Sequence, residues 1–66
     1  MRQTEAQDAL KKIEGRIAQL TEQIARQRSY IADLKQRGLG AGDARLALVL
    51  LEQLLELEYA NRDKLE

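Results

Sequence analysis

Leucine occupies seven of the twelve positions between residues 46 and 57 of this 66-residue chain. So many leucines in one stretch predict a helix that is apolar around roughly half of its circumference, whereas an ordinary surface helix carries an apolar stripe of about 100°. One partner helix from the same short chain cannot cover such a surface. The stretch therefore predicts that the chain associates with a second copy of itself or with another protein.

The composition predicts a small all-α protein. Residues of high helix propensity dominate the sequence, and proline is absent. A domain of this size buries only about 60% of the surface of its unfolded chain, so its core needs additional stabilisation. Cysteine and histidine are both absent, which excludes disulfides and the common zinc sites. Oligomerisation remains as the stabilising device.

A heptad repeat predicts a first helix over residues 4–37. Thr4 opens the sequence T-E-A-Q, which matches a helix capping box. Apolar residues then recur at alternating spacings of three and four, which is typical of a coiled-coil-like seam. This seam consists of Leu10, Ile13, Ile17, Leu20, Ile24, Ile31 and Leu34. Gln27 interrupts it, and we expect Gln27 either to set the register by pairing with another polar group or to reach water at a bundle edge.

A glycine-rich segment predicts a tight turn over residues 38–42. Gly38 is placed to adopt the left-handed conformation that ends a helix in a Schellman motif, and Gly40 and Gly42 keep the link flexible. The segment is not a phosphate-binding loop, because no strand precedes it and no Lys-Ser/Thr follows it. Asp43 is the predicted N-cap of a second helix over residues 43–64.

The five-residue link places the two helices antiparallel. We therefore predict one all-α domain over residues 1–66, an antiparallel two-helix hairpin that assembles as a dimeric, coiled-coil-like four-helix bundle. Within the chain, Leu50, Leu54 and Leu57 are expected to meet Ile31, Gln27 and Ile24, and Leu46 is expected beside Leu34. The flanking residues Leu46, Leu48, Leu51 and Leu55 would include those that contact a second chain. Residues up to Ile13 would extend beyond the second helix, leaving Leu10 and Ile13 uncovered.

The charges are balanced overall but divided between the helices. The formal net charge is zero, whereas residues 1–37 are basic and residues 43–66 are acidic, which favours antiparallel pairing. Three i,i+4 pairs are expected on the first helix: Asp8–Lys12, Glu22–Arg26 and Asp33–Arg37. Glu58 is the one acid on the apolar arc of the second helix. We expect it to contact Gln27 or an arginine, or to lie where the bundle opens.

These patterns predict an interaction or regulatory module that is not an enzyme and holds no metal or cofactor. The favoured partner is a second copy, with a higher oligomer or another protein as alternatives. A Rop-like nucleic-acid-binding dimer is a further alternative, because Lys12, Arg16, Arg26 and Arg37 lie on one side of the first helix. The low pI of about 6.3 and the presence of only two aromatic residues disfavour it. No apolar run is long enough for a membrane span and no leader segment is visible, so a cytoplasmic location is expected.

The sequence from Ile17 to Leu65 resembles a group of short alphaproteobacterial proteins of unknown function. The resemblance lies in the pattern I-A-R-Q-R from Ile24, followed by Ile31 and Leu34, a glycine turn, an Ala/Leu-rich helix and the closing segment N-R-D-K-L. It implies a helical hairpin and no particular activity. The expected architecture is also similar to that of Rop, a dimeric helical hairpin that binds RNA, and this similarity concerns the fold alone.

Overall fold

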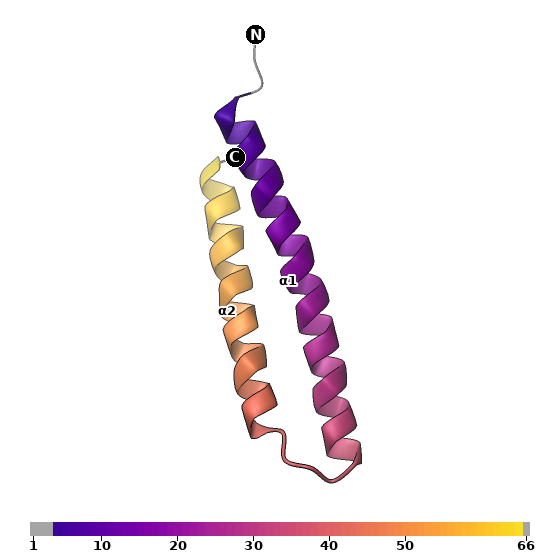
Figure 1. The fold of residues 1–66 in the computed structure, drawn as a ribbon. Coiled ribbons are helices and arrows are strands. Elements are labelled where there is room, and N and C mark those ends of the chain that lie inside the picture. Colours follow the sequence, from indigo (N-terminus) through magenta and orange to yellow (C-terminus); the bar gives the residue numbers. More distant parts are fainter. Residues whose placement is uncertain (1–3, 66) are drawn as a thin grey trace.

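The structure, a computed structural model, describes residues 4–65 as two helices packed against each other. Helix α1 spans Glu5–Gln36 and helix α2 spans Gly42–Leu65. They run side by side as an antiparallel hairpin, with the connecting turn at one end of the rod and the start of α1 and the end of α2 near the other (Figure 1). The Cα atoms extend over 59 × 14 × 12 Å. The predicted all-α hairpin is therefore confirmed.

The start of α1 follows from a local cap. Thr4 has extended backbone angles, and its hydroxyl oxygen accepts a hydrogen bond of 3.0 Å from the backbone N–H of Gln7. Glu5 and Asp8 lie in the first turn, where negative charge interacts favourably with the helix dipole. The predicted N-cap at Thr4 is confirmed.

The end of α1 is a Schellman motif. Gly38 has φ 74°, in the left-handed region that glycine adopts without steric cost. The backbone N–H of Leu39 donates to the carbonyl oxygen of Leu34 at 2.9 Å, and that of Gly38 donates to Lys35 at 3.0 Å. These two bonds are the pair that defines the motif. The predicted role of Gly38 is confirmed.

The start of α2 differs from the prediction. The helix begins at Gly42, and the backbone N–H of Arg45 donates to the carbonyl oxygen of Ala41 at 2.9 Å. Asp43 therefore lies within the first turn, and its prediction as the N-cap was wrong. The cause is tertiary packing, because Ala41 and Ala44 are buried against Ile31 and this contact sets where the helix begins.

A single seam between the helices forms the core. The buried residues are Ile13, Ile17, Ile24, Ile31, Ala41 and Ala44. Helix α2 contributes an inner seam whose members recur every four and three residues and are buried or half-buried: Ala44, Leu48, Leu51, Leu55, Glu58 and Arg62. Among the described residues, no large side chain is fully buried. Two helices alone thus leave every core residue partly open to water.

The structure corrects which leucines face α1. Leu50, Leu54 and Leu57, expected inside the hairpin, are 54%, 49% and 61% exposed. Leu48, Leu51 and Leu55, expected at the flanks, lie on the inner seam and are half-buried. The prediction was wrong because the broad apolar arc of α2 holds two heptad seams, and periodicity alone does not select between them.

The structure also corrects the axial register. The start of α2 lies beside Ile31 and Gln27, because Ala44 packs against Ile31 and its carbonyl oxygen accepts a hydrogen bond from Gln27. The expected pairing of Leu46 with Leu34 was therefore wrong. Helix α2 consequently reaches further along α1 than expected.

This shift covers residues that were expected to be bare. Ile13 is only 6% exposed and Leu10 is half-buried. The expectation that both lack cover within the chain was wrong. Only the first turns of α1 extend beyond the end of α2 (Figure 1). Neither helix within residues 4–65 has an apolar segment that could cross a membrane.

Gly38→Ala tests the Schellman ending. Because an alanine side chain disfavours the left-handed region, we expect this variant to lose about 1 kcal/mol or more of unfolding free energy. Chemical denaturation followed by circular dichroism measures the loss.

Gly40→Ala is the matched control. Gly40 has no positive φ, and an added Cβ would meet nothing within 4 Å. Its unfolding free energy should stay unchanged or rise. Equal losses in both variants would contradict the assignment of the helix ending to Gly38.

Candidate interaction surface

The outer face of α2 is the largest uncovered apolar feature among the described residues. We define this outer face as Leu46, Val49, Leu50, Leu54 and Leu57, which are 45–61% exposed. Leu46, Leu50, Gln53, Leu57 and Ala60 recur every four and three residues and form a second heptad seam. This second seam is offset by two residues from the inner seam, which places it about 160° away around the helix axis. Helix α2 therefore has two nearly opposite seams, and α1 occupies one of them.

Helix α1 has no matching surface. Among its described residues, Tyr30 is the one large apolar side chain that is mainly exposed. A row of exposed alanines, Ala18, Ala25 and Ala32, flanks its buried isoleucines. Exposed apolar surface is therefore concentrated on α2.

A shallow groove of about 220 Å³ runs between the helices beside Leu54. Its lining residues are Arg16, Gln19, Leu20, Gln23, Leu54 and Glu58. Two amides, two leucines and an ion pair are suited to contact with a protein surface. Residues 4–65 contain no group of three or more acidic side chains that could hold a metal ion.

Polar contacts join the two helices on both sides of the seam. The Nε of Arg16 donates to the Oε2 of Glu58 at 2.9 Å, and Arg28 pairs with Glu52 at 3.0 Å. Gln27 is half-buried, and its Nε2 donates to the carbonyl oxygen of Ala44 at 3.0 Å. Each of these contacts joins one position on α1 to one position on α2. Together they pin the axial register of the hairpin.

Glu58 is the most enclosed of the charged partners, with its side chain 18% exposed. One carboxylate oxygen pairs with Arg16, and the other is buried without a hydrogen-bond partner among the described residues. An arginine contact was one of the expected environments for Glu58. Burial makes this carboxylate depend on Arg16, because an unpaired charge away from water is costly.

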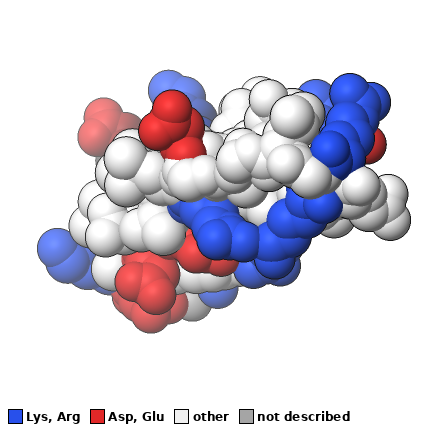
Figure 2. Space-filling model, turned by 90° about the horizontal axis from the view of Figure 1, so that it is seen from below, with Lys and Arg blue, Asp and Glu red and all other residues white. Residues whose placement is uncertain are grey.

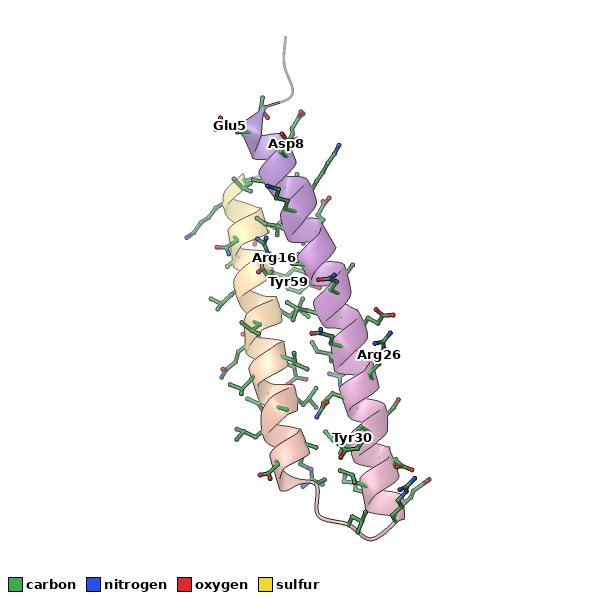
Figure 3. All side chains as sticks on the ribbon, in the orientation of Figure 1. Glu5, Asp8, Arg16, Arg26, Tyr30 and Tyr59 are labelled. Atoms are coloured by element: carbon green, nitrogen blue, oxygen red, sulfur yellow. The ribbon has the colours of Figure 1, made fainter. Side chains whose placement is uncertain are left out.

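The structure does not bring Lys12, Arg16, Arg26 and Arg37 into one unpaired basic face. Arg16 points toward α2, whereas Arg26 lies on the other side of α1 (Figure 3). Arg26 pairs with Glu22 and Arg37 with Asp33, both at 3.1 Å. The expected Asp8–Lys12 pair is not among the ion pairs of residues 4–65. Seen from the turn end, Lys and Arg side chains run together in a band across one part of the surface, and most of the visible Asp and Glu side chains lie outside this band (Figure 2).

Comparisons with known protein families, with curated proteins and with solved structures found no match to this chain. The chemistry and geometry of its own residues therefore carry the functional argument.

Sequence reasoning missed the groove and the second seam of α2. A signal for the seam was present, because a strict heptad counted from Ala44 selects Leu48, Leu51 and Leu55 and leaves Leu46, Leu50 and Leu57 outside. The groove depends on the axial register, for which the sequence holds no comparable signal.

Glu58→Gln tests the importance of the partly buried ion pair. We expect it to lower the unfolding free energy by about 1 kcal/mol, because it removes a charge-assisted hydrogen bond from an enclosed site. Urea denaturation at low and high salt measures this loss.

The matched control is Glu22→Gln, since the Glu22–Arg26 side chains are 66% and 74% exposed. Exposed pairs of this kind contribute about 0.5 kcal/mol or less. If Glu22→Gln proved as costly as Glu58→Gln, burial would not explain the difference between the two pairs.

Proposed function

We propose that this chain is a non-enzymatic, homo-oligomeric helical bundle that acts as a protein–protein interaction or regulatory module, with a homodimer of hairpins as its basic unit. The outer face of α2 is the observation that carries the proposal. Its four leucines are about half exposed or more, although each would be stabilised by roughly 1.5–3 kcal/mol on full burial. A continuous apolar surface of this kind marks an interaction site.

The small core of the hairpin supports the same proposal. Four isoleucines and two alanines are buried, and no large side chain within residues 4–65 is fully enclosed. A core of this size supplies only about 3–5 kcal/mol in a domain of fewer than 70–80 residues. Burial of the outer leucines against a second copy would contribute a comparable amount. Folding and association would then be coupled.

The charge distribution is compatible with self-association. The formal net charge is zero, so two copies do not repel each other through their overall charge. Three of the four residues of the expected basic face, Arg16, Arg26 and Arg37, are already paired with carboxylates. These pairs weaken the attraction for phosphate that nucleic-acid binding requires. A protein partner therefore fits the surface better than a nucleic acid.

The double variant Leu46→Lys/Leu57→Lys tests the proposal. The wild-type chain is expected to sediment as a dimer at micromolar concentration. Because each chain would lose two apolar contacts of at least 1.5 kcal/mol, the dissociation constant should rise by about 100-fold or more. Sedimentation equilibrium measures the change.

Tyr30→Lys is the control, because Tyr30 is also more than half exposed but lies on α1. It should leave the dissociation constant within about threefold of wild type, as expected for a surface substitution outside an interface. A wild-type chain that is a folded monomer, or a double variant that remains fully dimeric, would overturn the proposal.

A further inference from the structure

We infer that two copies meet back to back through α2 alone, in antiparallel orientation, so that the four helices lie in a row with both α2 helices at the centre and both α1 helices outside. The inference rests on the proposed self-association. It adds which surface is used, how the second copy is oriented and which residues face each other.

The two seams of α2 point in nearly opposite directions. The inner seam faces α1, and the second seam lies about 160° away around the helix axis. A helix in a closed four-helix bundle instead directs its apolar residues toward neighbours on adjacent sides. Helix α2 thus presents Leu46, Leu50 and Leu57 directly away from α1, whereas Leu54 lies at the side, beside the groove. Those leucines are best covered by a helix on the far side of α2.

Helix α1 offers a second copy no apolar surface comparable to that of α2. Its sides carry the alanine row on one flank and polar groove residues such as Arg16 and Gln23 on the other. A closed bundle would bury one of these flanks against the second copy. The row arrangement leaves both of them in water. The uneven distribution of exposed leucines between the helices therefore favours α2 as the only contact.

The residues at the edges of the outer face favour an antiparallel orientation. The two edges of the outer face differ, since one carries Arg45 and Glu56 beside Val49, whereas the other carries Ala47 and Leu54. In an antiparallel two-fold pair each edge meets the same edge of the second copy, so charges meet charges and apolar residues meet apolar residues. A parallel pair would place the charged edge against Leu54. Charge burial disfavours that arrangement.

The positions of the outer leucines along α2 set the register of the pair. The outer leucines run from Leu46 to Leu57, so an antiparallel pair covers all of them when the two-fold axis passes midway along this stretch. Leu46 then lies opposite the partner's Leu57, and Arg45 lies on the same edge as the partner's Glu56, offset from it by about two residues or 3 Å along the helix axis. Two such charge pairs form by symmetry. Arg45 and Glu56 are both exposed and lie outside the ion pairs within residues 4–65.

Glu52 lies close to the axis on the charged edge, where two copies would bring two carboxylates together. Its Oε2 already pairs with Arg28 of the same chain at 3.0 Å. This internal pair neutralises the carboxylate before association. At the contact between copies, Arg45 therefore lies near a carboxylate of opposite charge, the partner's Glu56. The charge of Glu52 is neutralised by Arg28 of the same chain.

Disulfide cross-linking tests orientation and register, because the chain has no native cysteine. Leu46→Cys and Leu57→Cys are prepared separately and oxidised alone and as a mixture after exchange of subunits. We expect a covalent dimer in the mixture and little in either variant alone. Efficient cross-linking of each variant with itself, without a mixed product, would show parallel pairing and overturn the inference.

The order of the helices is tested without altering the outer face. A nitroxide label on Glu22→Cys lies on the exposed side of α1, near the level of the axis, and pulsed electron resonance reports the distance between the two labels. In the row, the α1 axes are about 24–30 Å apart, so the labels should be about 40 Å apart once their arms are added. A closed bundle places the α1 axes within about 14 Å, and a label distance below about 30 Å would overturn the inference.

The two proposals fail in different ways. Sedimentation of the labelled Glu22→Cys protein as a monomer overturns both the proposed function and the inferred arrangement. A stable dimer with short label distances overturns the arrangement alone and leaves self-association intact. Tyr30→Cys, on α1, is the negative control for cross-linking and should give no covalent dimer.

Discussion

The hairpin depends on one line of contact, in which four isoleucines of α1 pack against the inner seam of α2. Burial of these side chains is the main stabilising term that two helices can supply. A rod only two helices thick cannot enclose that contact, so water reaches the seam from both sides. The partly covered core and the uncovered outer leucines are two results of the same geometry. Both would be relieved by adding helices.

Polar contacts fix the axial register of the two helices, which the apolar seam alone does not determine. Gln27 contacts the backbone of Ala44 near the turn, and Arg16 pairs with Glu58 toward the other end. A heptad seam by itself permits slippage by whole repeats, because its residues are chemically alike. These directional contacts have one partner each and select one register. The buried alanines beside Ile31 also help to select this register, since their small side chains let the start of α2 approach α1 closely.

The parts of the fold that depend on local sequence were predictable. Thr4 begins α1 and Gly38 ends it through contacts with residues a few positions away, so their roles could be inferred from neighbouring residues. The inner face and the axial register of α2 could not be predicted from the sequence, because they depend on how Ala41 and Ala44 pack against Ile31. The same limit applies to the interaction surface. An apolar excess on the second helix was evident from the leucine count, but its division between an inner seam and an outer face required the three-dimensional arrangement.

The cluster of Ile31, Ala41 and Ala44 at the turn also bears on the order of folding. Its members lie within 13 residues of one another in the chain, whereas Arg16 and Glu58 are separated by 42. The entropy lost on closing a loop increases with the length of the loop, so contacts at the turn form at the lowest cost. Contacts between the helices are then expected to form first at the turn and afterwards, one after another, toward the far ends of both helices. Pulse labelling of amides during refolding would record this order as protection that appears first at the turn and later toward both ends.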